Sequence, residues 1–405
     1  MPNASRRTFL THSVLTGAAV AQTKPIADIA VIGAGVFGAW TAFMLRQAGA
    51  RVTLIDQHGA ANNRASSGGE SRITRAGYGP KEIYTRWSME ALAVYKEFYG
   101  ATDPTLYHET GFLWMGRPDD AYMNANLAAF RKLGVKHDVL TREEMGKRFP
   151  GIGLEGLTWG IFEYQAGGLM ARRGVQTVVR HLVKNGLRYE QARVEAPGRG
   201  RKVESVAGVK AGQFVFACGP WLPQVFPDLL RGRIRPTRQE VFYFGAGAGE
   251  ATFRAPLLPA WVDPGDTIYG LPDLENRGFK IAPDGHGPEV DPETQERVVP
   301  QASVDRVRAY LRKLFPLLSG APLTQAEVCQ YENTVNGDYL IDRHPEQENV
   351  WLLGGGSGHG YKHGPAVGKY TAKLVLEGGR TEKMFALGTK ALYDPANRSS
   401  TIPGK

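Results

Sequence analysis

The sequence is poor in cysteine, with only Cys218 and Cys329 among its 405 residues. Two cysteines exclude a disulfide framework and any metal site built from several cysteines, although one disulfide between them stays possible. We expect no metal site. The sequence also lacks nucleic-acid-binding motifs and any basic stripe with interleaved aromatic residues. Its net charge of +9 therefore indicates a basic surface and not a nucleic-acid partner.

No transmembrane segment is expected, because the apolar stretch near the N-terminus is too short and too polar to cross a bilayer. That stretch, residues 13–21, follows Ser5-Arg6-Arg7-Thr8-Phe9-Leu10, which resembles the twin-arginine consensus. It ends in Ala19-Val20-Ala21, a small-residue cleavage site. We expect residues 1–21 to be a twin-arginine signal peptide read by the twin-arginine export machinery, which places the mature protein in the periplasm or outside the cell.

A dinucleotide-binding fingerprint begins at residue 28. A buried-strand pattern over 28–32 leads into a glycine-rich turn, a helical stretch over 39–47, and a second strand over 51–55 that ends in an acid. The glycines and the acid are Gly33, Gly35, Gly38 and Asp56. The glycines permit a tight turn and close approach to a pyrophosphate at the helix N-terminus, and the acid accepts hydrogen bonds from a ribose. The fingerprint alone does not distinguish NAD from FAD.

Four further segments carry a family resemblance. They are Ser66-Ser67-Gly68-Gly69-Glu70-Ser71-Arg72-Ile73-Thr74-Arg75, Ala76-Gly77-Tyr78-Gly79, Cys329-Gln330-Tyr331, and the run from Gly354 to Lys362. In this order and spacing they resemble the sarcosine oxidase and N-methyltryptophan oxidase branch of the D-amino-acid oxidase superfamily. The resemblance extends from about residue 28 to about residue 380.

The resemblance implies FAD as the cofactor, held covalently through Cys329. The other side chains and backbone positions that it assigns to the cofactor are Gly33, Gly35, Gly38, Asp56, Ser66, Ser71, Arg72, Gly219, Gly356, Gly358, His359, Gly360 and Lys362. A glycine-rich loop that opens a helix, expected over 365–376, would stabilise negative charge on the reduced flavin.

The resemblance also implies an oxidase of a secondary amine that bears a carboxylate. Hydride transfer to FAD and reoxidation by O2 would give H2O2 and an imine that hydrolyses. Arg75 and Lys362 match the pair that holds the carboxylate, and Lys280 matches the lysine that activates oxygen. The catalytic set is completed by Arg72, Tyr269 and Tyr331. A dehydrogenase that passes electrons to a carrier stays open, whereas the complete flavin motifs argue against a non-catalytic binding protein. The amine itself is undetermined, and we expect a monomer.

Two positions depart from the family pattern. A pocket histidine of the family falls on Asp284, with His286 two residues further on, and a small hydroxyl residue falls on Glu332. If these carboxylates point inward, they could pair with a basic substrate or perturb the pKa of the amine. Sarcosine itself is therefore in doubt as the substrate.

The fold expected is α/β (α+β), with an FAD-binding Rossmann-like domain of the glutathione-reductase type interleaved with a mixed-sheet substrate domain. The FAD-binding domain is expected over 26–111, 167–236 and 327–379, and the substrate domain over 112–166 and 237–326. Helices are expected over 168–182, after the capping box Thr141-Arg142-Glu143-Glu144, and over 304–317. Residues 394–405 are expected to be a flexible tail.

Overall fold

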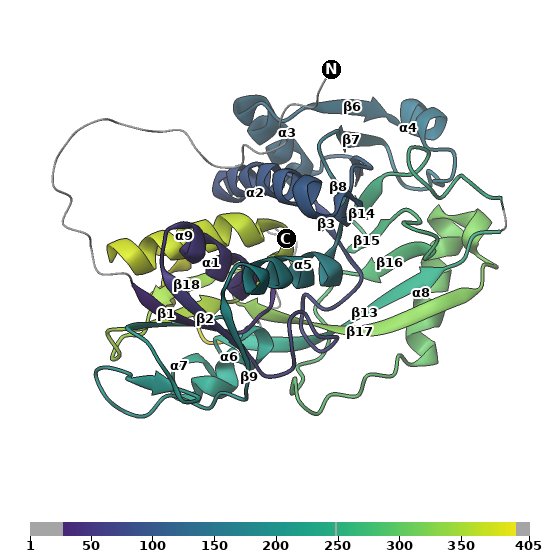
Figure 1. Ribbon diagram of the computed structural model, residues 1–405. Helices are drawn as coiled ribbons and strands as arrows, with labels where there is room; N and C mark the ends of the chain where they lie inside the picture. Colours follow the sequence, from purple (N-terminus) through teal and green to yellow (C-terminus); the bar gives the residue numbers. More distant parts are fainter. Residues whose placement is uncertain (1–26, 248, 394–405) are drawn as a thin grey trace, which may run out of the picture.

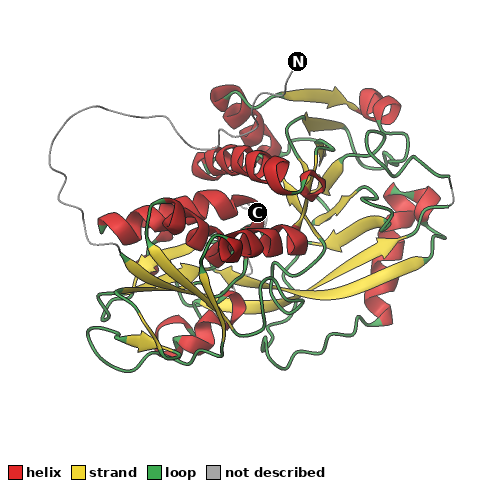
Figure 2. Cartoon of the chain, in the orientation of Figure 1, coloured by secondary structure: helices red, strands yellow, loops and turns green. Residues whose placement is uncertain are grey.

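The computed structural model describes residues 27–247 and 249–393 of the chain (Figure 1). The predicted signal peptide (1–21) and the predicted tail (394–405) lie outside the described residues. Within the described part, two large sheets and two small ones are connected by nine α-helices and short 3-10 turns, and helices cover the sheets (Figure 2).

The first large sheet has six strands and carries the fingerprint. Its strand order is β18 (Leu340–Arg343), β19 (Val350–Gly354), β12 (Gln213–Phe216), β1 (Asp28–Ile32), β2 (Arg51–Asp56) and β9 (Arg188–Gln191). All neighbouring pairs are parallel except β18 with β19. The apolar residues of β1 alternate in direction, as the period-2 geometry of a strand requires. Ile29 and Val31 join one core cluster, and Ala30 and Ile32 join another.

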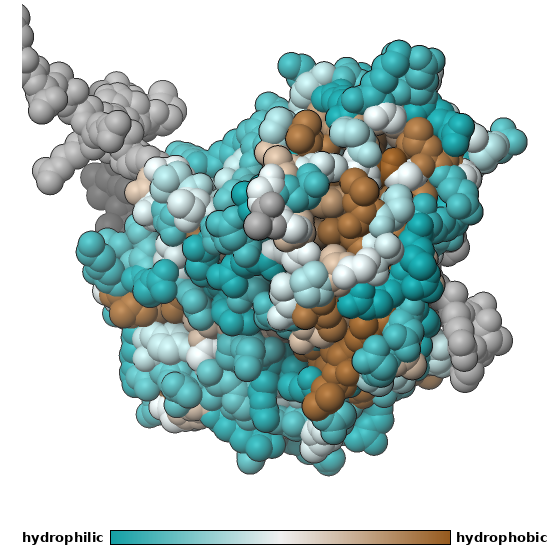
Figure 3. Space-filling view, turned by 90° about the vertical axis from the view of Figure 1, so that its right-hand side faces the viewer, coloured by the Kyte–Doolittle hydropathy of each residue, from teal (hydrophilic) through white to brown (hydrophobic). Residues whose placement is uncertain are grey.

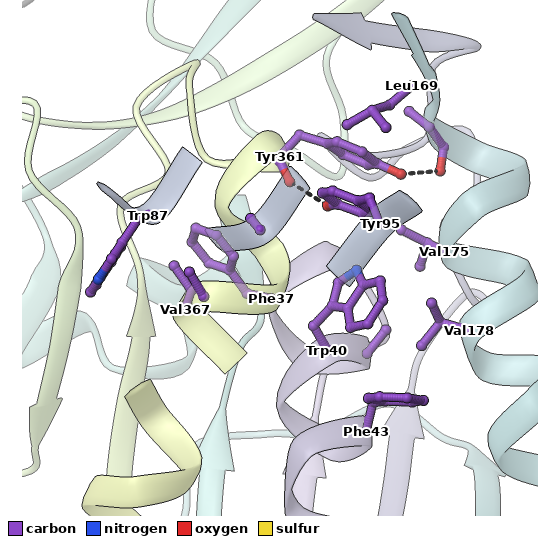
Figure 4. Close-up of a cluster of buried hydrophobic side chains, with 14 of the residues drawn as sticks. Phe37, Trp40, Phe43, Trp87, Tyr95, Leu169, Val175, Val178, Tyr361 and Val367 are labelled. Atoms are coloured by element: carbon purple, nitrogen blue, oxygen red, sulfur yellow. Dashed lines mark hydrogen bonds between the residues drawn. The ribbon is translucent and has the colours of Figure 1, made fainter. Parts of the chain in front are cut away.

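Helices pack on the face that Ile29 and Val31 occupy. They are α1 (Val36–Gln47), α2 (Glu82–Thr102), α5 (Ala171–Lys184) and α9 (Gly364–Glu377). Trp40 of α1 meets Tyr95 of α2 edge to face at 5.4 Å, and Tyr95 donates a hydrogen bond to the carbonyl of Tyr361 (Figure 4). The other face is covered by α6 (Leu222–Val225), α7 (Pro227–Leu230) and the hairpin of β10 (Ser205–Val206) with β11 (Val209–Lys210).

The second large sheet has eight strands and is mixed. Its order is β17 (Leu323–Thr334), β13 (Ile234–Phe244), β16 (Phe279–Pro283), β15 (Ile268–Leu271), β14 (Ala260–Asp263), β5 (Phe112–Gly116), β7 (Trp159–Glu163) and β6 (His137–Thr141). Only β14 with β5 is parallel. Helix α8 (Gln301–Leu314) packs Val304, Val307 and Leu311 on one face of it. Residues of the opposite face, among them Trp114, Ile161 and Val262, join the core cluster that contains Ile29 and Val31 of the first sheet.

A three-stranded sheet joins segments far apart in the sequence. It consists of β3 (Ser71–Thr74), β8 (Gly167–Met170) and β4 (Tyr107–His108). The remaining helices, α3 (Ala121–Leu133) and α4 (Arg142–Arg148), lie beside β6 and β7 (Figure 1). Residues 168–170, expected to begin a helix, are in β8 instead, and α5 starts at Ala171. These residues form a strand because their backbone pairs with β3 and β4, which are distant in the sequence.

The predicted fold class is confirmed: a Rossmann-like sheet and a mixed sheet are built from interleaved segments. The capping box is also present, since Thr141 Oγ1 accepts from the N–H of Glu144 and Glu144 Oε2 accepts from the N–H of Thr141. The domain boundaries stay a prediction. Strands β13 and β17 run across two of the predicted boundaries, at 236/237 and 326/327.

The face seen in Figure 3 is mostly hydrophilic, with hydrophobic residues gathered in a broken band. Within residues 27–247 and 249–393, no helix is long and apolar enough to span a membrane. The same residues contain no group of three or more histidine, cysteine, aspartate or glutamate side chains placed to hold a metal ion.

Candidate functional site

The turn between β1 and α1 brings backbone unusually close to backbone. Gly33 has a φ of +104°, and a Cβ there would lie 2.2 Å from the carbonyl oxygen of Ala217. A Cβ at Gly38 would lie 1.8 Å from the carbonyl oxygen of Gly33. Neither position therefore admits a side chain. The N-terminus of α1 reaches the wall of a cavity at this point, where its N–H groups favour an anionic phosphate.

Asp56 ends β2 beside this turn. Its Oδ2 accepts a hydrogen bond from the N–H of Ala34 at 2.7 Å, and its Oδ1 accepts one from the N–H of His58 at 2.9 Å. Burial raises the pKa of this carboxyl, and the N–H donors oppose the increase. A carboxylate has about four lone-pair sites and three backbone N–H groups contact this one, so Asp56 is placed to accept a further hydrogen bond from a ribose hydroxyl.

An elongated cavity runs from this turn to the eight-stranded sheet. The predicted residues in its wall are Gly33, Gly35, Asp56, Ser66, Arg72, Gly219, Tyr331, Gly356, Gly358 and Gly360. Two oxygens in the wall, Ser66 Oγ and Glu332 Oε2, are buried without a hydrogen-bond partner among the described residues. Buried polar atoms are rarely left unsatisfied, so a ligand rich in hydroxyl and carbonyl groups fits this cavity. Together with the glycine turn and Asp56, the wall fits FAD.

Arg72 and Cys329 meet at the sheet end of the cavity. Arg72 lies on β3 and donates to the carbonyls of Ser66 and Ser71, at 2.6 and 2.7 Å. Its Nη2 lies 3.3 Å from Cys329 Sγ on β17. Both cysteines are free thiols. Cys329 does not itself appear in the cavity wall, but its contact with Arg72 places it directly behind that wall.

Lys280 is almost completely buried, at 1% exposure, on β16. Its Nζ donates to the carbonyl of Ser71 at 2.7 Å and to Ser71 Oγ at 3.2 Å. Burial lowers the pKa of this ammonium group to about 7, and the positive charge of Arg72 adds to the decrease. Lys280 therefore changes charge near neutral pH, one side chain away from the end of the cavity.

Arg75 and Lys362 converge on Tyr78. Lys362 lies in the 3-10 turn η4 (Tyr361–His363) before α9 and donates from Nζ to Tyr78 OH at 3.0 Å. The guanidinium of Arg75 lies 4.8 Å from the Tyr78 ring centroid and 4.5 Å from that of Trp114, and it donates to the carbonyl of Gly77. Burial lowers the pKa of Lys362 well below its ordinary value, and the charge of Arg75 adds to this. Two basic side chains thus contact the same tyrosine.

His359 contacts Tyr78, the residue at which Arg75 and Lys362 meet. Its Nδ1 lies 2.8 Å from Tyr339 OH and 3.3 Å from Tyr78 OH, and its Nε2 lies 2.9 Å from the carbonyl oxygen of Gly337. The side chain predicted to contact the cofactor is therefore turned toward the tyrosines and away from the cavity wall. Burial, then the charge of Lys362, lower the pKa of His359 well below its ordinary value. The neutral ring positions Tyr78, and through it Lys362.

Tyr269, Tyr331 and Asp284 lie close together at the eight-stranded sheet. Tyr269 pairs in register with Ala282, two residues from Lys280 and from Asp284, which follows β16 directly. Tyr331 OH donates to Asp284 Oδ1 at 3.1 Å. Burial raises the pKa of Tyr269 to about 12, so its hydroxyl stays protonated. Asp284 is thus turned inward, whereas His286 lines a separate pocket with Arg233 and Arg235.

Sequence reasoning missed two acids that shape the site. Glu163 at the end of β7 accepts from the N–H groups of Ala76 and Gly77 and from Trp114 Nε1, at 2.6, 3.2 and 2.7 Å. It thereby fixes the backbone beneath Arg75. Glu293 lies in the cavity wall and accepts from Arg64 and Trp221. No motif marks either residue, since both act through contacts with segments distant in the sequence.

The comparisons with known proteins agree with this geometry. The family described as FAD dependent oxidoreductase matches residues 28–374. The chain is 31% identical to monomeric sarcosine oxidase of Streptomyces avermitilis over 366 residues, which cover 88% of this chain and 95% of that protein. It is 26% identical to N-methyl-L-tryptophan oxidase of Salmonella arizonae over 360 residues, covering 86% and 95%.

Solved structures share the fold. L-proline dehydrogenase from P. horikoshii superposes with a TM-score of 0.77 at 20% identity, covering 89% of this chain and 97% of that one. A thermally stable mutant of fructosyl peptide oxidase gives a TM-score of 0.78 at 19% identity, covering 94% and 97%. The chain belongs to the FAD dependent oxidoreductase family, with monomeric sarcosine oxidases and N-methyl-L-tryptophan oxidases among its relatives, and it is an FAD-dependent oxidoreductase.

Proposed function

We propose that the protein oxidises a secondary amine that bears a carboxylate, with O2 as the electron acceptor. Bound FAD would supply the acceptor for a hydride from the carbon next to nitrogen, and O2 would then take up two electrons and two protons as H2O2. The amine loses two hydrogens and becomes an imine, which water hydrolyses. The relatives named as sarcosine and N-methyl-L-tryptophan oxidases support this reaction class.

The meeting of Arg75 and Lys362 at Tyr78 is the observation that carries the proposal. Positive charges on Arg75 and Lys362 repel each other, as the lowered pKa of Lys362 indicates, and an anionic substrate would relieve that repulsion. A carboxylate held by both would be fixed in orientation, so that the amine end projects toward the pocket of Tyr269, Tyr331 and Asp284. Fixing both ends of a small substrate is what directs one C–H bond to the cofactor.

Lys280 favours O2 over a protein carrier as the acceptor. A cation near the reacting centre stabilises the negative charge that an electron adds to O2. Its position behind Ser71, next to Arg72, puts that charge close to the sheet end of the cavity. A dehydrogenase that passes electrons to a carrier is the second candidate, since the fold is shared with an L-proline dehydrogenase.

The test is a substrate screen on the purified holoenzyme. Oxygen uptake and H2O2 are measured with sarcosine, other N-methyl amino acids, cyclic imino acids and glycated amino acids, each beside its decarboxylated analogue. We expect one class to be oxidised with one H2O2 per O2, and the matching amine without a carboxylate to be poor. Fast dye reduction without oxygen uptake would instead establish the dehydrogenase.

We further propose that Cys329 carries FAD through a thioether bond. The 3.3 Å contact with Arg72 supports this, because Arg72 lines the cavity that fits FAD and the contact places Cys329 Sγ directly behind that wall. Acid denaturation followed by peptide mapping tests it: flavin should remain on the peptide that contains Cys329. Flavin released to the supernatant would contradict covalent attachment and leave the fold assignment intact.

We also propose export through the twin-arginine pathway, and a monomeric state. The motif Ser5-Arg6-Arg7-Thr8-Phe9-Leu10 supports export. Residues 1–27 fused to a reporter should send it to the periplasm, and the double change Arg6→Lys and Arg7→Lys should retain it in the cytoplasm. Light scattering should give the mass of a single chain, and a mass of two chains would overturn the monomer.

A further inference from the structure

Glu332 joins β17 to the glycine-rich loop that precedes α9. It is 6% exposed and lies two residues before the end of the strand. Its Oε1 accepts a hydrogen bond from the N–H of Gly356 at 3.2 Å, and its carbonyl accepts one from the N–H of Ser357 at 3.0 Å. One carboxylate oxygen is therefore engaged with the loop, and the side chain is held in a single orientation.

The other oxygen, Oε2, faces the cavity. It has no hydrogen-bond partner among the residues that the structure describes. A Cβ added to Gly354 would lie 3.5 Å from it, and one added to Gly219 would lie 3.8 Å from it. Two glycines thus leave open space around a buried carboxyl oxygen. A buried acceptor without a partner is costly, so this oxygen is matched to a ligand group.

The position of Glu332 along β17 identifies which part of the cofactor passes it. Glu332 lies three positions after Cys329, a distance of about 10 Å along a strand. Cys329 and Arg72 mark one end of the cavity, and Gly33 and Gly35 mark the phosphate end. The part of FAD between the ring and the phosphates is a chain of hydroxyl groups, and in this cavity it would pass Glu332.

Few charges surround this carboxyl. Its neighbour on β17 is Tyr331, and the loop before α9 contributes His359, whose ring is turned toward Tyr339. The segment before η2 (Gly219–Trp221) contributes the Cys218 thiol, and α1 contributes the ring of Phe37 beside the loop. Farther along the wall lie Asp56 and Arg72. Burial raises the pKa of Glu332 to about 7, and the loop N–H groups oppose the increase.

We propose that Glu332 is a cofactor contact that couples proton binding to the reduction of FAD. Its Oε2 hydrogen-bonds to a hydroxyl group of the chain between ring and phosphates. Reduction adds negative charge to the ring, so an ionised Glu332 opposes reduction and a protonated one does not. The midpoint potential of bound FAD should therefore fall more steeply with pH in the range over which Glu332 loses its proton. This inference rests on FAD dependence and on the proposed position of the ring beside Arg72 and Cys329, and it holds for any amine substrate.

The test is a spectroscopic redox titration of the holoenzyme at intervals from pH 5.5 to 8.5. Wild type is compared with Glu332→Gln, which keeps the shape and removes the charge. The matched control is Glu293→Gln, because Glu293 lines the same cavity but is 24% exposed and hydrogen-bonded through both oxygens. We expect an inflection near pH 7 in wild type and in Glu293→Gln, and none in Glu332→Gln.

Two results overturn the inference. One is an inflection that persists in Glu332→Gln, and the other is its loss in Glu293→Gln as well. Should Glu332→Gln fail to hold flavin, the visible spectrum of wild type over the same pH range decides. A flavin band that shifts with one titration near pH 7 supports the inference, and a band that does not move overturns it. None of these readouts depends on turnover of a substrate.

Discussion

Burial of Lys280 shifts the pKa of its side chain into the neutral range. It is buried against Ser71, and its pKa of about 7 means that it is mostly protonated below neutral pH and mostly neutral above it. If its positive charge assists the reduction of O2, reoxidation of the reduced enzyme should slow as pH rises through about 7. Lys280→Met should slow reoxidation about 100-fold at pH 6 and abolish this pH dependence.

Stopped-flow mixing of reduced enzyme with O2 measures this rate without substrate turnover. Lys280→Arg is the matched variant, since it keeps a positive charge and should flatten the pH profile while retaining much of the rate. Reduction of the flavin by substrate should change little in Lys280→Met. A reoxidation rate in Lys280→Met equal to that of wild type would remove Lys280 from oxygen chemistry.

Asp284 stands where relatives are expected to have a histidine, and it accepts a hydrogen bond from Tyr331 OH. A carboxylate opposite the Arg75 and Lys362 pair is placed to receive the protonated amine of an amino acid. Asp284→Asn should raise KM about tenfold for the preferred substrate, since a hydrogen bond to a charged group contributes roughly 1.5–3 kcal/mol. His286→Ala, in the separate pocket, should leave KM unchanged. An unchanged KM in Asp284→Asn would place this carboxylate outside the substrate contact.

Residues inside motifs were predictable, and residues that act through distant contacts were not. Arg72, Arg75 and Lys362 stand in contiguous patterns. The structure places Arg72 in the cavity wall and brings Arg75 and Lys362 together at Tyr78. Glu163 has no pattern, because its role is to bind the N–H groups of Ala76 and Gly77, some 87 residues away. The direction of the Asp284 side chain likewise depends on Tyr331, which lies on another strand.

At the scale of elements, α1 and the glycine turn form one unit. Gly38 lies in the first turn of α1, and an added Cβ would meet the Gly33 carbonyl at 1.8 Å. Gly38→Ala should therefore push α1 away from the turn and release or prevent flavin binding. The matched control is Gly100→Ala in α2, where no atom lies within 4 Å of the added Cβ. That change should stabilise the protein by roughly 0.5–1 kcal/mol.

Flavin content after purification and the thermal unfolding midpoint measure both variants. Full flavin content in Gly38→Ala would show that α1 adjusts without loss of the site. A lower midpoint in Gly100→Ala would show that the conformational advantage of alanine is offset by contacts at that position.

Elements with strong local signals were predicted, and elements defined by pairing were not. Strand β1 has the predicted bounds, and α9 (Gly364–Glu377) exceeds its predicted range by one residue at each end. Residues 168–170 have a helical pattern continuous with α5, yet they form β8. Their pairing with β3 and β4 supplies hydrogen bonds that local propensity does not report.

At the scale of the molecule, the two large sheets are connected through β17. Strands β13 and β17 pair along eleven residue pairs, and the β17 end of this ribbon reaches the glycine loop after β19 through Glu332 and Ser357. FAD would contact both the six-stranded sheet, through Gly33 and Asp56, and the eight-stranded sheet, through Tyr331. A ligand bound across such a junction stabilises both parts together.

Cys329→Ser makes this coupling measurable, because it removes the proposed covalent bond and leaves binding reversible. The unfolding midpoint of this variant should rise with added FAD. At an FAD concentration of 100 times Kd, the free energy of unfolding should increase by about 2.7 kcal/mol. Wild type, with covalent flavin, should not respond to added FAD. Circular dichroism and flavin fluorescence should report one coincident transition in both proteins, since separate unfolding of either sheet would break the site. Two transitions, of which only one shifts with FAD, would show that the sheets unfold independently and that the cofactor is held by one of them.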